Sequence, residues 1–434
     1  MKSIIKISAL GVLLSISTQF YAQNRDLDNY KQPDKRGINV FEDPKDSVST
    51  FEELKVRIGG SSTLQYQALD HQNLPEPTAA NNTLIEIGNN FNLATANLDL
   101  DVALHHGVRM HLRTYLSSRH HPETYVKGGY LQIDRLDFIR PGFGEKFMKY
   151  ATIKLGHMEN NYGDGHFRRS DNAQAIYNPF VGNYIMDAFT TEVGAELYLR
   201  NNGWLLMLGA TNGKLNQGVN NPGLTSPSIM SKIGYDKQLN QDLRVRLTAS
   251  IYNTASSQKT YLYGGDRAGS RYYFVMENAG GMVDGKFVPT SSSAQFSSGL
   301  INPLLNNKLT AIMINPFVKY KGLEFFGMYE TVNGRNYTEK DRRDWTQISA
   351  ELIYRFGKTE NFYVAGRYNT VSGKLASGQD VDVKRTQLGL GWFMTKNILT
   401  KFEYVNQTYD GFSTADIRQQ GKFHGFSAEA IVSF

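Results

Sequence analysis

The sequence contains no cysteine, which excludes a disulfide framework, a thiolate metal site and a lipid-modified cysteine. Beyond residue 22, no apolar run approaches the roughly 20 residues that a membrane-spanning helix needs. Glycine-rich phosphate loops, dinucleotide-binding fingerprints and basic helices are also missing. We therefore expect no cofactor, no bound metal and no nucleic-acid partner.

Glycine and aromatic residues, in contrast, are abundant: the chain has 40 Gly, 25 Tyr and 24 Phe against only 12 Pro. This composition is typical of strands, tight turns and aromatic belts rather than of helices. The mean hydropathy is −0.42, and for a membrane protein such a value favours a barrel, because barrel strands are half polar.

The N-terminus has the pattern of an export signal. Lys2 and Lys6 accompany an apolar run over residues 4–16, and a polar stretch leads to Ala22. We expect residues 1–22 to be a cleaved signal peptide; the alternative, a membrane-anchoring helix, needs a longer run. Loss of the two lysines lowers the formal net charge from +6 to +4, so the mature chain is mildly basic.

Two further segments follow the signal. Residues 23–50 are polar and without periodicity. We expect them to form an N-terminal tail in the periplasm, either an extension or a mobile segment. Strict alternation of apolar and polar residues begins at Lys55, so we assign residues 51–434 to a β-barrel.

The alternating segments are separated by connections that are short and long in turn. Short connections are predicted at 105–107, 141–146, 201–203, 237–241, 321–322, 357–361 and 395–397. Long ones are predicted at roughly 69–90, 117–126, 159–187, 213–227, 254–307, 333–344, 371–383 and 410–421. We therefore predict an all-β fold, a transmembrane antiparallel β-barrel of about 16 strands, within a range of about 14 to 18. A β-sandwich would explain the strands but not the alternation of connection lengths.

The C-terminal segment 426–434 predicts how the barrel closes. Its apolar residues share one face and the chain ends on Phe434. A soluble edge strand would leave this stripe exposed, whereas a lipid-embedded strand needs it. We expect it to pair with the first strand, near 55–68. The ending resembles the C-terminal signal of bacterial outer-membrane barrels, which implies a Gram-negative outer membrane, contact with its lipid and lipopolysaccharide, and recognition of Phe434 by the barrel-assembly machinery.

Several hairpin registers follow from the turns. In the hairpins around 105–107, 321–322 and 357–361, charged residues fall on the face opposite the apolar one. The expected pairs are Asp101 with His111, Asp99 with Arg113, Lys319 with Glu324, Val318 with Phe325, Ile314 with Tyr329, and Glu351 with Arg367.

A barrel of this size is too wide for its own side chains to fill. The loop over 159–187 occupies the third external position, where the third loop of general porins folds inward. The layout is similar to that of bacterial porins, and Ile153 to Gly156 followed by Tyr162 and Gly163 resembles phosphate-selective porins of the O and P type. The resemblance implies an outer-membrane porin, a passive diffusion channel for small hydrophilic solutes.

Basic side chains are the candidate pore-lining residues. The candidates are Arg168, Arg169 and His166 in the third loop, and Lys232, Arg244, Arg246, Arg109, Arg113 and Arg57 on the wall. Arg244 and Arg246, with Lys232 opposite, form the densest basic patch, and we expect no inward acid in their hairpin. Rings of cationic side chains in a narrow pore favour anions, but acidic residues interrupt the series of basic residues along this wall. We expect a weakly anion-preferring or unselective pore; alternatively, the charges only solvate the wall.

The long loop at 254–307 carries five aromatic residues. They are Tyr261, Tyr263, Tyr272, Tyr273 and Phe274. They would cover the pore or grip a sugar or protein by stacking. The alternative, which we favour, is a hairpin that extends strands beyond the membrane.

Two other classes of function stay open. His157, Asp164, His166 and Asp171 would have to gather for an enzyme of the barrel protease or lipase kind, and no spacing requires that, so we expect no enzyme. The barrel would otherwise be a scaffold in a larger outer-membrane assembly, a secretion or uptake complex. A homotrimer fits the porin, and a heteromeric membrane complex fits the scaffold.

Overall fold

The computed structural model describes residues 27–74, 83–118, 124–170, 173–215, 219, 224–265, 273–284, 286–289 and 299–434. The signal peptide expected at 1–22 lies outside these residues. Within the described ranges, no helix is long and apolar enough to cross a membrane.

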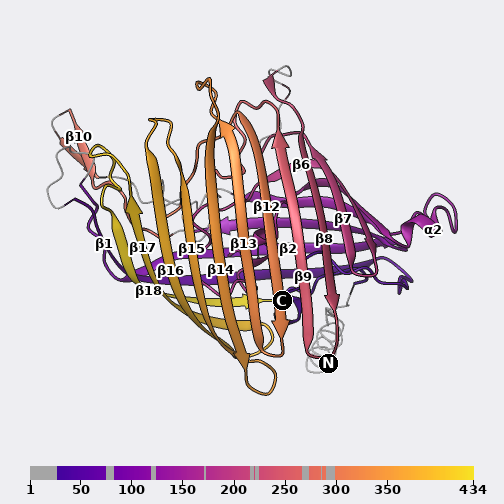
Figure 1. The fold of residues 1–434 in the computed structure, drawn as a ribbon. Helices are drawn as coiled ribbons and strands as arrows, with labels where there is room; N and C mark the ends of the chain where they lie inside the picture. Colours follow the sequence, from indigo (N-terminus) through magenta and orange to yellow (C-terminus); the bar gives the residue numbers. More distant parts are fainter. Residues whose placement is uncertain are drawn as a thin grey trace, which may run out of the picture.

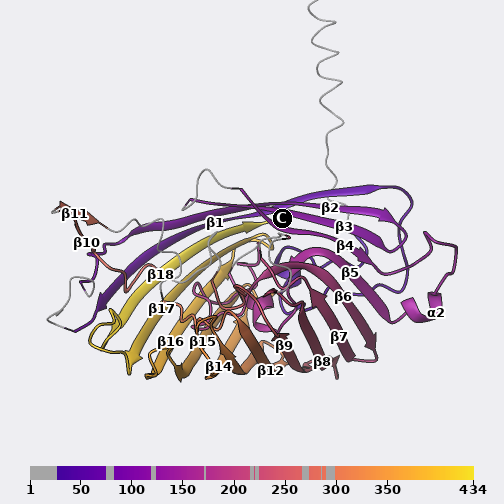
Figure 2. The ribbon, with the colours of Figure 1, turned by 90° about the horizontal axis from the view of Figure 1, so that it is seen from above.

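Sixteen antiparallel strands form one closed barrel, as the sequence predicts (Figure 1). In chain order they are β1 (Lys55–Gln72), β2 (Asn90–His105), β3 (Val108–Ser117), β4 (Tyr125–Ile133), β5 (Ala151–Glu159), β6 (Thr191–Asn201), β7 (Trp204–Thr211), β8 (Ser228–Gln238), β9 (Leu243–Thr254), β12 (Lys308–Tyr320), β13 (Leu323–Arg335), β14 (Arg343–Phe356), β15 (Phe362–Lys374), β16 (Asp380–Phe393), β17 (Ile398–Asp410) and β18 (Lys422–Ser433). Figure 2 shows these strands curving around an interior that other chain segments occupy.

The last strand closes the barrel against the first. Ser433 lies opposite Ser61, and the ladder runs from there to the pair of Lys422 and Gln72. The backbone of Phe434 exchanges two hydrogen bonds of 3.0 Å with Gly60. Both sheet edges are therefore paired, which removes the unpaired N–H and C=O groups that would otherwise attract other chains.

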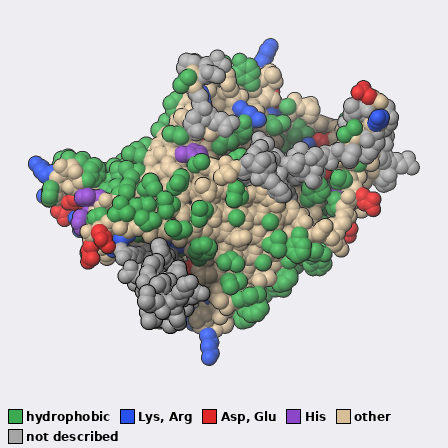
Figure 3. Space-filling view, turned by 180° about the vertical axis from the view of Figure 1, so that it is seen from behind, with side chains coloured by type: hydrophobic (Ala, Val, Ile, Leu, Met, Phe, Trp, Pro, Cys, Tyr) green, Lys and Arg blue, Asp and Glu red, His purple; other side chains and the backbone are tan. Residues whose placement is uncertain are grey.

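The registers expected from the turns are confirmed for all six pairs. The alternation places apolar side chains outward, where Leu247, Leu352, Leu388 and Phe402 are each at least half exposed, with fractions of 54–56%. Figure 3 shows the same pattern on one side of the molecule: the wall carries hydrophobic and uncharged atoms, and charged side chains appear mainly at the rims. This distribution suits a wall that faces lipid.

One predicted short connection is wrong. Instead of a turn at 141–146, the chain leaves the barrel between the end of β4 at Ile133 and the start of β5 at Ala151. This excursion contains the helix α2 (Glu145–Met148) and projects from the barrel (Figure 1). The prediction was wrong because the apolar residues Leu136, Phe138 and Phe143 resemble the ends of strands in the sequence.

Contrary to the favoured alternative, the long loop between β9 and β12 does not extend the barrel strands. A separate hairpin, β10 (Gly280–Val283) and β11 (Lys286–Pro289), extends away from the barrel (Figure 1). Tyr263 and Tyr273, in contrast, turn into the lumen and are buried. Tyr272 lies outside the described residues.

Candidate functional site

The third loop between β5 and β6, which the structure describes over residues 160–170 and 173–190, crosses the lumen and is fastened to the far wall. Lys401 on β17 donates hydrogen bonds to the backbone oxygens of Ala175 (3.0 Å), Asn178 (3.2 Å) and Phe180 (2.8 Å). Further along, the Arg385 side chain on β16 donates to the backbone oxygen of Asn183 at 2.5 Å. Inward polar residues of β14 to β17 therefore satisfy the backbone of a buried loop, which would otherwise be costly to bury.

Tyrosine hydroxyls from the loops form a second set of attachments. Tyr162 donates to the Glu330 carboxylate at 3.0 Å, and Tyr263 donates to the same carboxylate at 2.5 Å. Tyr184 and Tyr273 donate to Glu351 and Glu403, also at 2.5 Å. Each of these wall carboxylates thus binds a hydroxyl from a segment that belongs to a loop.

The near end of the third loop is held by Asp164. Its carboxylate accepts hydrogen bonds from Arg246 at 2.8 and 2.9 Å, from Lys232 at 3.0 Å and from Thr248 at 2.8 Å. Burial opposes ionisation, but the adjacent Arg246 and Lys232 hold the pKa of the Asp164 carboxyl well below its usual range. Asp164 is therefore an anion that neutralises two wall cations.

The sequence-predicted basic patch is thus not free of acids. Asp236 lies directly opposite Arg246 within the same hairpin, 3.0 Å from it, and 2.7 Å from Arg244. The expectation that this hairpin lacks an inward acid is wrong. The alternation that turns Lys232 inward turns Asp236 inward as well, so this carboxylate was detectable in the sequence.

The N-terminal segment 27–50 does not form a mobile tail; it enters the lumen from the short-turn end. Glu42 lies 2.8 Å from Arg246 and 3.6 Å from Lys232. Burial opposes ionisation of Glu42, yet these two cations lower its pKa to about 2. Asp43 lies 3.0 Å from Lys154 and 3.2 Å from Arg109. The polar composition of this segment suggested disorder in the sequence, but its acidic residues instead pair with the cations of the lumen.

Packing and rim contacts fix the same segment. Phe41 is buried, with its ring centroid 5.4 Å from that of Phe317 and 4.3 Å from the Arg246 guanidinium carbon. At the barrel rim, the Lys35 backbone donates to the Lys396 oxygen at 2.9 Å, and the Ser433 hydroxyl donates to the Pro33 oxygen at 2.6 Å. The segment therefore links the lumen to the last two strands.

All nine predicted pore-lining residues lie inside the barrel, but they do not form one ring. Most are divided among separate ion pairs: Arg57 and Arg109 with Asp101, Arg113 with Asp99, Arg168 with Glu351, Arg169 with Asp187, Arg244 with Asp236, and Lys232 and Arg246 with Asp164. His166 contacts Asn161 at 3.1 Å and Glu159 at 3.5 Å. Burial lowers the pKa of His166, so it is mainly neutral at pH 7.

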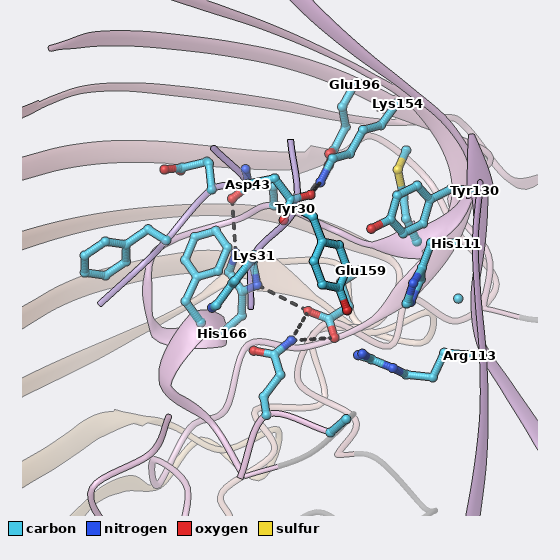
Figure 4. A pocket seen from close by; sticks show the side chains of 18 of the residues that line it. Tyr30, Lys31, Asp43, His111, Arg113, Tyr130, Lys154, Glu159, His166 and Glu196 are labelled. Carbon is cyan, nitrogen blue, oxygen red and sulfur yellow. Dashed lines mark hydrogen bonds and ion pairs between the residues drawn. The ribbon is translucent and has the colours of Figure 1, made fainter. Parts of the chain in front are cut away.

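A cavity of about 160 Å³ lies between the N-terminal segment, the third loop and the wall of β3 to β6 (Figure 4). Its cationic lining residues are Lys31, Arg109, Arg113, Lys127 and Lys154, and its acidic ones are Glu42, Asp43, Glu159 and Glu196. Sequence reasoning missed Lys31, because no periodicity marks the segment that carries it.

Lys31 differs from the other cations of the cavity. Its ammonium lies 4.0 Å from the centroid of the Tyr177 ring and 5.6 Å from that of Phe167. Within the described part of the chain, no carboxylate lies within ion-pair distance of it. Burial lowers the pKa of Lys31 to about 8.

A second cavity, of about 980 Å³, opens toward the short-turn end of the barrel. Phe41, Glu42 and Asp43 line both cavities. The N-terminal segment therefore lies at the boundary between a wide vestibule and a narrow interior cavity.

The residues considered for catalysis do not gather. His157 alternates with the inward Lys154 and Met158 and so faces outward, whereas Asp164 pairs with Arg246 in the lumen. Asp171 lies outside the described residues. Among the residues that the structure describes, no group of three or more metal-ligating side chains is found.

Comparisons with known proteins identify the architecture. No family model and no curated protein matches the sequence. The structure is similar to the anion-selective porin from Comamonas acidovorans (TM-score 0.53, 11% identity, 88% of this chain and 100% of that chain). It is also similar to the outer membrane channel DcaP of Acinetobacter baumannii (0.51, 10%, 89% and 100%) and to OmpT, an outer membrane protein of Vibrio cholerae (0.50, 10%, 90% and 100%). The chain thus has the fold of an outer-membrane barrel.

Proposed function

We propose that this protein is a porin of the Gram-negative outer membrane, a passive channel for small hydrophilic solutes. The observation that carries the proposal is a closed barrel, apolar outside and polar inside, whose lumen is narrowed by two inserted segments. Its structural likeness to an anion-selective porin and to an outer membrane channel supports the same function. The short turns then face the periplasm and the long loops face the exterior.

The narrow part of the path lies where the N-terminal segment meets the third loop. Solute would pass between the vestibule and the smaller cavity by way of Phe41, Glu42 and Asp43. A cavity of about 160 Å³ has room for a few water molecules or one small solute. We therefore expect a small conductance for a barrel of this size.

Charge at this constriction favours anions only weakly. Five cations and four acids line the smaller cavity. Asp43 lies within ion-pair distance of both Lys154 and Arg109, so much of the positive charge is neutralised. Lys31, which has no such partner among the described residues, is the side chain that we expect to attract anions. This balance does not favour the phosphate-selective kind, whose basic ladder is nearly unbroken.

Planar-bilayer recordings of the purified protein test this function directly. We expect discrete conductance steps, and a reversal potential in a salt gradient that indicates a slight preference for anions. The Lys31→Gln variant should lose that preference and keep the steps. Absence of steps would overturn the channel, whereas a clear cation preference would overturn only the selectivity.

The filled lumen favours one other function, a barrel that acts as a scaffold in a larger outer-membrane complex. Both inserted segments are held by many buried contacts, so conduction would then be incidental. Purification from native membranes distinguishes the two functions. Stable partners of unlike sequence favour the scaffold.

Recovery of a homotrimer alone would favour the porin. One structure of the similar Vibrio cholerae protein is described as a trimer form, which supports this oligomer here. We further propose contact with outer-membrane lipid and lipopolysaccharide, and insertion by the barrel-assembly machinery.

A further inference from the structure

The excursion at residues 134–150 begins in the lumen, where Asp134 lies 3.0 Å from Lys45, and then crosses the short-turn rim, where Phe143, Lys146 and Lys149 border the vestibule. Met148 is buried against Ile133 and Ala151, and the neighbouring side chains are Leu131, Ile153 and Leu197. These wall residues alternate with the inward Gln132, Thr152 and Lys154, so they belong to the outer face. The excursion therefore folds back over the membrane-facing side of β4 to β6, at their short-turn ends.

Its apolar side chains are not covered by the rest of the protein. The exposed fractions are 49% for Phe138, 59% for Ile139, 41% for Phe143, 51% for Phe147 and 40% for Tyr150. Such a cluster of large apolar residues on a projecting turn is costly in water. It continues the apolar surface of the barrel wall, on which Leu155 is 41% exposed.

Three basic residues accompany these apolar side chains. Within the described part of the chain, no carboxylate lies within ion-pair distance of Arg140, Lys146 or Lys149. Arg135, in contrast, is paired with Asp137 at 2.7 Å. The arrangement of apolar side chains beside free cations is typical of a segment that lies in a membrane interface.

We propose that residues 136–150 are an interfacial anchor that binds the phospholipid leaflet at the short-turn end of the barrel. Phe138, Ile139 and Phe147 enter the acyl boundary. Arg140, Lys146 and Lys149 bind the phosphate groups of the lipids. Continuity with the outer wall and the complementary charge both favour lipid over a periplasmic protein. The proposal rests on the membrane location of the barrel and is independent of conduction.

Spin-labelled single-cysteine variants test the anchor, and the natural absence of cysteine makes them straightforward. Ile139→Cys and Phe147→Cys would be labelled and reconstituted in vesicles of phosphatidylethanolamine and phosphatidylglycerol. Accessibility to oxygen and to a water-soluble nickel complex gives the depth of each label. Asp242→Cys, in the exposed turn between β8 and β9, is the matched control.

We expect the two labels to show a higher ratio of oxygen to nickel accessibility than the Asp242→Cys label. The depth should increase with phosphatidylglycerol content, and the R140Q/K146Q/K149Q background should remove that dependence. Labels as accessible to nickel as the control would overturn the anchor. Protection that appears only when periplasmic extract is added would assign the surface to a protein partner and also overturn it. Conductance steps should persist in every variant, so failure of the channel would be recognised separately.

Discussion

Asp164→Asn should partly release the third loop from the barrel wall. The carboxylate joins the loop to Arg246, Lys232 and Thr248 by four hydrogen bonds, and asparagine can neutralise neither cation. The far side of the loop keeps its bonds to Lys401 and Arg385. We therefore expect the near part, about residues 160–169, to undock while the barrel stays folded.

The free-energy cost of Asp164→Asn depends on how many carboxylate partners Arg246 keeps. Breaking a buried ion pair costs about 3–5 kcal/mol. Because Glu42 and Asp236 remain within 3.0 Å of Arg246, the lower figure applies. A cost of about 3 kcal/mol shifts the equilibrium between docked and undocked loop about 100-fold, since about 1.4 kcal/mol corresponds to a factor of ten.

Two measurements check this release. Single-channel recordings should show a larger conductance substate with increased occupancy, and hydrogen exchange should be faster in peptides that cover 160–169. Glu339→Gln is the matched control, because it removes the ion pair between Arg343 and Glu339 of the connection between β13 and β14, away from the third loop. The reasoning is refuted if Asp164→Asn exchanges as slowly as the parent protein and shows the parent conductance.

Three further predictions concern charge and assembly. Because the pKa of Lys31 is lowered to about 8, its positive charge is present below that pH and lost above it. The anion preference, measured by reversal potential, should therefore decrease between pH 7 and 9. The Lys31→Gln variant should show no such change with pH. The E42Q/D43N double variant leaves four wall cations with fewer anionic partners, so the reversal potential should shift toward anions; a shift toward cations would contradict the assigned ion pairs. Deletion of Phe434 should lower the amount of inserted barrel, measured by heat-modifiable gel mobility, more than the conductance of inserted molecules; equal insertion would exclude its assembly role.

The barrel itself was predictable because alternation and turn chemistry act locally. The turn at Lys321 and Gly322 determines the pairing of Lys319 with Glu324, and the outward apolar stripe determines which face is buried. The same reasoning gave a wrong prediction for the connection at 134–150, because apolar residues there contact the outer wall without forming strands.

The site was less predictable, because its contacts join residues far apart in the sequence. The wall cations could be placed inward, and partners within the same hairpin could be predicted, as Asp99 was for Arg113. Partners on another segment could not, as Glu42 shows for Arg246. Residues 27–50 show no periodic pattern of apolar and polar residues from which their position in the lumen could be predicted. Asp236 was missed although it could be predicted, since its position on the inward face follows from that of Lys232.

The attachments of the loop tyrosines have a consequence for biogenesis. Tyr162 and Tyr184 are made early in the chain, whereas their carboxylate partners Glu330 and Glu351 lie on strands that come much later. Contacts of such long sequence separation form slowly. These attachments therefore form only when the second half of the barrel is in place, and a chain interrupted before then would expose its third loop to proteases.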